Sequence, residues 1–137
     1  MVNDMDERLE LSCIVGDEIK DAVVELYDGI ICKIRFISGE MHYETAAENY
    51  FYALRELRKI LEPLGIKLLC KGCALNVYPS PMILDMGCAV KAYDLTLGKR
   101  ALTKDLVYIF DPCKPEDYAT IAEQDAFYDN WISSLRN

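Results

Sequence analysis

The first third of the chain has the alternation of apolar and polar positions that is typical of β-strands. Residues 9–15 carry Leu, Leu, Cys and Val at every second position, which predicts a strand with one buried face. Asp28-Gly29 lies between two further β-rich runs and predicts a hairpin over residues 20–37. A three-residue loop, residues 27–29, sets apolar residues opposite one another and places Gly29 at the left-handed position of a bulge. The expected pairs are Leu26 with Ile30, Val24 with Cys32 and Ala22 with Ile34, whereas a two-residue Asp28-Gly29 loop would pair Val24 with Lys33 and Leu26 with Ile31.

A helical period replaces this alternation after residue 44. Thr45-Ala46-Ala47-Glu48 has the sequence of a capping box, in which the Thr hydroxyl and the Glu carboxylate each accept from a free backbone N–H. The helix should run to about Glu62, because Pro63-Leu64-Gly65 stops it. The expected apolar stripe is Ala47, Tyr50, Phe51, Leu54, Leu57, Ile60 and Leu61, and the solvated side holds Tyr52 among Glu48, Arg55, Glu56, Arg58, Lys59 and Glu62.

The middle of the chain predicts a second hairpin and a short helix. A two-residue Lys71-Gly72 loop would pair Cys70 with Cys73, Leu68 with Leu75 and Ile66 with Val77, all on one apolar face. Ser80-Pro81 has the N-cap-then-proline order that starts a helix, and Gly87 has the position that ends one. Two strands should follow: residues 88–97, and residues 106–110, whose unbroken apolar run is typical of a central strand covered on both faces.

The last part of the chain predicts a long helix. Thr120-Ile121-Ala122-Glu123 has the sequence of a second capping box. Ile121, Tyr128, Trp131, Ile132 and Leu135 then recur at helical spacing, with Asp125 and Asp129 on the polar side. The order of elements predicts a single α+β domain over residues 1–137, with a mostly antiparallel sheet built from hairpins, two long amphipathic helices and one short helix.

Charge narrows the choice of partners. The 137 residues carry a net charge of −8, and the acids gather at the two ends of the chain, with 9 of them in residues 1–30 and 6 in residues 111–137. A protein this acidic repels phosphate backbones, so we expect no nucleic acid as partner. The start of the chain lacks the basic, then apolar, order of a signal peptide, and no run approaches the roughly 18 apolar residues of a membrane span. We therefore expect a cytoplasmic protein that binds no membrane.

Candidate chemical groups are few. Cys70 and Cys73 have the CxxC spacing of a metal or redox pair, but structural zinc needs four ligands and the other cysteines are singletons. A thioredoxin-like pair would lie at a helix N-terminus, so buried, reduced thiols are the favoured interpretation. His42 is the only histidine, and no nucleophile, P-loop or dinucleotide motif is present. The sequence assigns no catalytic residue and no cofactor.

Several short stretches resemble a group of small uncharacterised bacterial proteins. They are Asn76-Val77-Tyr78-Pro79-Ser80-Pro81-Met82, Asp85-Met86-Gly87, Ala92-Tyr93, residues 105–111, Glu123-Gln124, Phe127 and residues 131–135. The resemblance covers roughly residues 66–135 and leaves the acidic first third unmatched. It implies a bacterial cytoplasmic protein of the kind that accompanies polymorphic or contact-dependent toxins as an immunity protein, and it carries over no catalytic residue.

Three hypotheses about function follow. The first is a non-enzymatic protein-binding module, such as an immunity protein that covers a basic toxin domain with an acidic surface. Its contact residues would be Glu116, Asp117, Asp125, Asp129 and Tyr52. The second is a small enzyme or ligand-binding protein with a pocket near Tyr78, Asp85 and Tyr93. The third is a zinc-stabilised regulatory domain that uses Cys70 and Cys73.

Overall fold

The computed structural model describes residues 5–85 and 90–136, without the side chains of residues 84 and 85. The predicted α+β class is confirmed, but the strands form two antiparallel sheets. The larger sheet has the order β4-β3-β2-β1-β5. Its strands are β1 (Glu7–Val15), β2 (Glu18–Tyr27), β3 (Cys32–Ser38), β4 (Met41–Ala47) and β5 (Ile66–Leu68).

The second sheet and the helices come mainly from the second half of the chain. The smaller sheet has the order β6-β7-β8, with β6 (Val77–Tyr78), β7 (Lys91–Asp94) and β8 (Leu106–Tyr108). The α-helices are α1 (Tyr50–Leu61), α2 (Pro81–Asp85) and α3 (Ile121–Ser134), of 12, 5 and 14 residues. Short 3₁₀ turns span Glu62–Leu64, Lys71–Cys73, Thr103–Asp105 and Pro115–Asp117. No helix in the described part of the chain has both the length and the apolar character needed to cross a membrane.

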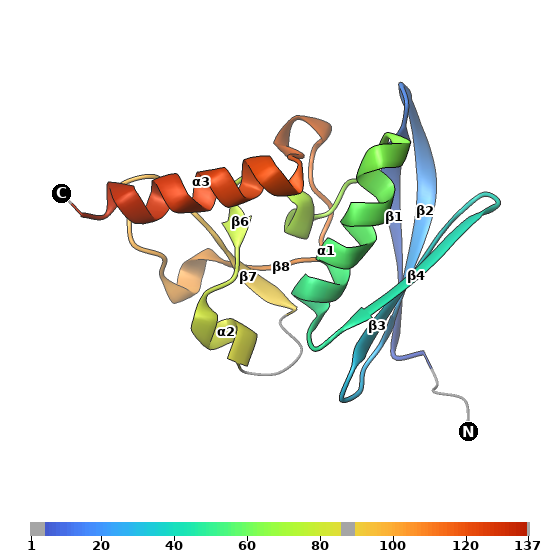
Figure 1. Ribbon diagram of the computed structural model, residues 1–137, viewed down its shortest axis with the longest axis horizontal. Helices are drawn as coiled ribbons and strands as arrows, with labels where there is room; N and C mark the ends of the chain where they lie inside the picture. Colours follow the sequence, from blue (N-terminus) through green and yellow to red (C-terminus); the bar gives the residue numbers. More distant parts are fainter. Residues whose placement is uncertain (1–4, 86–89, 137) are drawn as a thin grey trace.

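Helix α1 lies between the two halves of the molecule. Figure 1 shows it packed against one face of the five-stranded sheet, with the smaller sheet, α2 and α3 on its other side. Its fully buried residues include Phe51, Leu54 and Leu57, and the same core contains Ile34 and Phe36 of β3 and Ile109 and Phe110 after β8. One helix therefore supplies apolar contacts to both halves.

The β2–β3 hairpin has the predicted facing but a different register. Leu26 pairs with Ile34, and Val24 with Phe36, so each residue of β2 lies opposite one four positions beyond the predicted partner. A shift of four keeps the same side chains on the core face because the strand period is two. The loop is longer than either predicted loop, it leaves Ile30 97% exposed, and Gly29 has no positive φ. The predicted left-handed bulge at Gly29 is therefore wrong.

The start and one face of α1 also differ from the prediction. The N-cap is Asn49, whose side chain accepts from the backbone N–H of Tyr52, and β4 continues through the predicted capping box to Ala47. Thr45 lies in that strand and donates its hydroxyl to the Ala53 carbonyl. Arg58, expected on the solvated side, is 2% exposed, because the C-terminal half of the chain covers this face of the helix.

The predicted hairpin at residues 66–78 does not form. Its first arm, β5, pairs with β1, and its second arm, β6, pairs with β7 of the other sheet. Between them the 3₁₀ turn Lys71–Cys73 redirects the chain, and Leu75, predicted to face the core, is 40% exposed. Local facing alone cannot tell a hairpin from two short strands that pair with distant partners.

Of the predictions for the C-terminal half, some are confirmed and others are wrong. Thr120 caps α3 in the predicted capping box with Glu123, and Ser80 accepts from the Ile83 N–H at the start of α2. The predicted end of that helix at Gly87 lies outside the described residues. The strand expected over residues 88–97 is confirmed only as β7, and residues 88 and 89 lie outside the described part. The strand expected over 106–110 ends at Tyr108 and is an edge strand, since β7 is the central one.

Candidate functional site: an aromatic pocket beside helix α3

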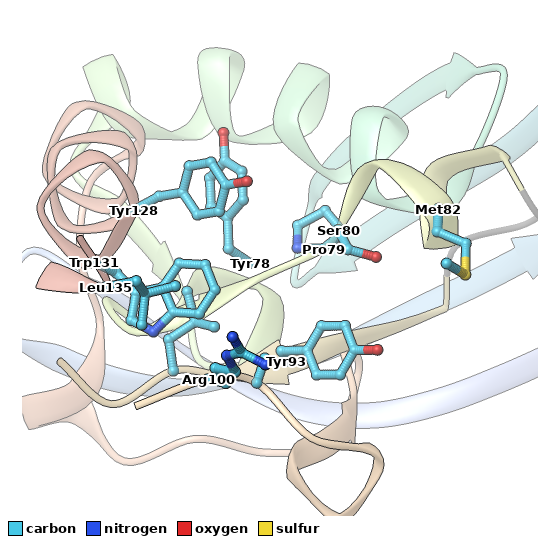
Figure 2. Close-up of a pocket in the computed structure, with 11 residues that line it drawn as sticks. Tyr78, Pro79, Ser80, Met82, Tyr93, Arg100, Tyr128, Trp131 and Leu135 are labelled. Carbon is cyan, nitrogen blue, oxygen red and sulfur yellow. The ribbon is translucent and has the colours of Figure 1, made fainter. Parts of the chain in front are cut away.

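A pocket of about 430 Å³ opens between α3 and the smaller sheet. Figure 2 shows its lining side chains, which come from three separate segments of the chain, residues 78–82, 93–101 and 128–135. Strands β6 and β7 supply Tyr78 and Tyr93, which are direct partners across the two strands and so project on the same side of the sheet. The full lining is Tyr78, Pro79, Ser80, Met82, Tyr93, Leu95, Arg100, Ala101, Tyr128, Trp131 and Leu135.

One wall of the pocket is a row of stacked rings. Tyr78 and Tyr128 lie with their centroids 4.1 Å apart and their planes 13° from parallel, and Tyr128 stacks on Trp131 at 5.9 Å and 24°. Tyr128, Trp131 and Leu135 recur every three to four residues, so they project from one face of α3. Stacking covers the facing sides of these rings, so the wall offers a ligand mainly ring edges, on which the face of a planar aromatic group packs edge to face.

The Tyr78 ring is fixed from behind by an ion pair. Its hydroxyl donates to Oδ1 of Asp125 at 3.0 Å, and Arg55 of α1 donates to both carboxylate oxygens of Asp125, at 2.8 and 2.9 Å. Arg55 lowers the pKa of the Asp125 carboxyl, while burial and the Asp125 carboxylate raise the pKa of Tyr78 to about 12. Tyr78 therefore stays a neutral donor at physiological pH, and its ring position is set by α1 and α3 together.

A buried amide fixes the strand that carries Tyr78. Gln124 of α3 is fully buried, and its Nε2 group lies 2.8–3.0 Å from the carbonyl oxygens of Gly72, Ala74 and Val77. Its Oε1 atom accepts from Arg58 at 2.7 Å, and Arg58 also donates to the Ala119 carbonyl at 2.7 Å. This network holds the backbone immediately before Tyr78, so the pocket wall is anchored to the core.

A loop after β7 forms a further side of the pocket, and two hydrogen bonds connect this loop to α3. The indole N–H of Trp131 donates to the Lys99 carbonyl at 2.9 Å, and the N–H of Gly98 donates to the Ser134 hydroxyl at 2.8 Å. Gly98 has a φ of 80°, a conformation that favours glycine, and lets the chain turn back toward the helix. Arg100 follows in this loop and lines the pocket.

Arg100 is the one charged group among the lining residues in the described part of the chain. Its side chain is exposed at the pocket rim, and it forms no ion pair with any described residue. The other polar side-chain groups of the lining are the hydroxyls of tyrosine and serine and the indole N–H of Trp131, which donates to the Lys99 carbonyl. Within the described residues, the pocket thus combines flat apolar walls with one uncompensated positive charge.

The residues of the sequence hypotheses are distributed unevenly around this site. Tyr78 and Tyr93 both line the pocket, while the side chain of Asp85 lies outside the described part of the chain. Asp125 is held by Arg55 and Tyr78, so its carboxylate is not free for a partner. Tyr52 is 37% exposed on α1 and is not a lining residue. Glu116, Asp117 and Asp129 are exposed, and none of the three forms an ion pair with a described residue.

The sequence did not identify the α3 side of the pocket or Arg100. The spacing of Tyr128, Trp131 and Leu135 was detected, but it predicts a core-facing stripe, and all three remain partly or largely exposed. The residue type was the available signal, because Tyr128 and Trp131 are aromatic and ligand pockets are lined mainly by hydrophobic and aromatic side chains. Which loop the helix would face depends on tertiary packing.

Cys70 and Cys73 are free, fully buried thiols, one just before the 3₁₀ turn Lys71–Cys73 and one at its end, with their sulfur atoms 3.7 Å apart. The neighbouring Cys73 thiol and burial raise the pKa of Cys70, whereas the Cys70 thiol lowers the pKa of Cys73. Across the described residues, no three Cys, His, Asp or Glu side chains come together as a possible metal site. Both cysteines belong to the hydrophobic core, which also contains Leu54 of α1 and Ile109.

No protein-family model matches the chain, and no curated protein sequence matches it significantly.

Proposed function

We propose that the protein is a non-catalytic binding protein and that the aromatic pocket is its recognition site. The single observation that carries this proposal is the stacked wall of Tyr78, Tyr128 and Trp131 beside an open volume of about 430 Å³. This volume is within the range of small-molecule sites, which are mostly apolar with a few polar groups. The described lining holds no carboxylate, imidazole or thiol to act as a general base or nucleophile, which favours binding over catalysis.

Hydrogen bonds hold two rings of the aromatic wall in fixed positions. Tyr78 is held through Asp125 and Arg55, and Trp131 through the Lys99 carbonyl. A recognition surface held in place before binding loses less conformational entropy when its ligand arrives. The network behind the pocket thus supports a binding role for its rings.

The test uses the single tryptophan of the chain, which lines the pocket. Its indole N–H gives one resonance, to be followed by NMR during titration with naphthalene-2-carboxamide, a neutral planar probe. We expect a saturable shift of this resonance with a dissociation constant of about 1 mM or tighter. Tyr128→Ala should abolish the saturable shift, and Tyr52→Ala, which removes a tyrosine outside the pocket, should leave it unchanged. No saturable shift, or equal binding by Tyr128→Ala, would contradict the proposal.

A second candidate is the protein-binding module expected from the sequence, with an immunity-type role against a basic toxin domain. The observation that favours it is that Glu116, Asp117 and Asp129 are exposed and lack ion-pair partners among the described residues. Such carboxylates would accelerate association with a basic surface at low salt.

This candidate is tested with the product of the adjacent gene, if that gene encodes a basic toxin domain. The triple variant Glu116→Gln, Asp117→Asn, Asp129→Asn should associate more slowly and with a flatter salt dependence. Glu18→Gln, whose carboxylate pairs with Lys20 on β2, is the control. If the association rate changes neither with salt concentration nor with the triple substitution, these acids do not steer association.

A further inference from the structure

We propose that the pocket selects a small planar aromatic monocarboxylate, whose charged group binds Arg100. This inference rests on the proposed function and names the chemical class of its ligand. Figure 2 shows the Arg100 side chain directed between the rings of Trp131 and Tyr93. The guanidinium therefore lies beside the aromatic wall, within reach of the charged group of a ligand packed on that wall.

The first argument is charge. The protein has a net charge of −8, yet the described lining contains one cation and no carboxylate. Arg100 has no ion-pair partner in the described part of the chain, whereas Arg55 and Arg35 are each paired with carboxylates. An anionic ligand is the group that would balance the charge of Arg100.

The second argument is geometry. A guanidinium presents parallel N–H donors in a planar fork that matches the two oxygens of a carboxylate. The rings of Tyr78, Tyr128 and Trp131 are stacked on one another, and the ring edges that this leaves toward the pocket attract the face of a planar aromatic body. A ligand with both features would use the wall and the rim at the same time.

The third argument limits the ligand's charge and size. One guanidinium balances one negative charge, and the remaining walls are apolar, so a doubly charged phosphate would leave one charge uncompensated on an apolar surface. The volume of about 430 Å³ accommodates a fused two-ring ligand and belongs to a concave site, which favours a free small molecule over a protein segment.

The test compares matched probes that differ in charge. Naphthalene-2-carboxylate and naphthalene-2-carboxamide have nearly the same shape, and both are titrated into the full chain at pH 7 while the Trp131 indole resonance is followed. We expect the carboxylate to bind about tenfold tighter than the amide, as for a charge-assisted hydrogen-bonded contact near solvent. Arg100→Gln should remove this difference, so that the carboxylate and the amide bind with equal affinity. Lys104→Gln, a neighbouring exposed cation outside the lining, should retain it.

The outcomes separate the two proposals. If the amide binds but the carboxylate binds no tighter, or if Arg100→Gln keeps the preference, the anion selectivity is wrong and the binding site remains. If neither probe shifts the indole resonance, the proposed function itself fails. A third probe, 2-naphthyl phosphate, tests the charge limit, because binding tighter than that of the carboxylate would overturn selection for a single negative charge. The amide spectrum of Arg100→Gln verifies that the variant is folded.

Discussion

Gly72 shows how tightly a single residue is constrained at the junction between α1 and the C-terminal half. Its N–H donates to the Ile109 carbonyl at 2.8 Å, and its own carbonyl accepts from Arg58 and Gln124. A Cβ atom added there would lie 2.5 Å from Cδ2 of Leu54 and 3.2 Å from Cβ of Ile109. The chain needs glycine here because the neighbours leave no room, since its φ is not in the left-handed region.

Gly72→Ala is therefore expected to destabilise the protein by overpacking. Leu54 can rotate its terminal methyl away, but Ile109 contributes both a Cβ and a carbonyl oxygen at 3.3 Å, which move only with the backbone. We expect a loss of about 1–3 kcal/mol in the free energy of unfolding, measured by urea denaturation. Lys71→Ala, at the adjacent and partly exposed position, is the control and should change the stability by much less. A Gly72→Ala protein as stable as the control would show that the turn repacks freely.

At the scale of elements, Asp125 joins helix α3 to α1 through Arg55 and to strand β6 through Tyr78. The two parallel hydrogen bonds to Arg55 make this a bidentate pair of good geometry, although the Asp125 side chain is 40% exposed. Solvent at that exposure screens the attraction, so its contribution to stability is modest. Its effect should nevertheless depend on pH.

Asp125→Asn should lower the free energy of unfolding at pH 7 by about 0.5–1 kcal/mol. Because the pKa of Asp125 is lower in the folded protein than its usual value of 3.8, the stabilisation is present above that value and is lost as the pH falls through the folded pKa. The difference between wild type and Asp125→Asn should therefore shrink between pH 6 and pH 3. Asp129→Asn, an exposed position on the same helix, should show no such convergence. A constant difference across this range would mean that the carboxylate charge is not what stabilises the contact.

Elements whose signals are local were predictable, and those that depend on distant partners were not. The cap of α3 at Thr120 is set by four consecutive residues and was predicted. The start of α1 was misplaced because Thr45 satisfies a helical motif but pairs with Ile34 in the sheet. The facing of β2 and β3 was right, since alternation fixes it, while the register depended on the length of a loop that sequence patterns do not fix.

On the scale of the whole molecule, the two sheets are coupled by polar side chains that looked solvent-facing in the sequence. Arg58 lies on the charged side of a strongly amphipathic helix, yet it is buried where α3 and the turn before Ala74 cover it. The hydrophobic pattern of α1 predicts which face packs on the five-stranded sheet. It does not predict that the opposite, polar face is covered by the C-terminal half of the chain. The same limit hid the pocket, whose walls come from three separated segments, although Tyr78 and Tyr93 were predicted to lie near it.

Gln124 connects α3 to α1 and to the backbone before β6, so its replacement should weaken the contact between the C-terminal half and the five-stranded sheet with α1. Gln124→Leu keeps a side chain of similar size but leaves the carbonyls of Gly72, Ala74 and Val77 and one Arg58 donor without this partner. Buried polar groups that lose their hydrogen bonds cost about 1–3 kcal/mol each, so we expect a loss of roughly 3 kcal/mol or more in the free energy of unfolding.

Unfolding of the C-terminal half can be distinguished from unfolding of the whole chain during guanidinium denaturation. The single tryptophan, Trp131, reports on the C-terminal half through its fluorescence, and far-ultraviolet circular dichroism reports on both sheets and the helices. Wild type should give coincident midpoints, as expected of one cooperative unit. In Gln124→Leu the fluorescence midpoint should fall below the dichroism midpoint, because α3 loses its anchor to α1 before the five-stranded sheet unfolds. Asn130→Leu makes the same amide-to-leucine change on the exposed side of α3 and should keep the midpoints coincident. Coincident midpoints in Gln124→Leu would mean that apolar contacts with α1 alone hold the two halves together.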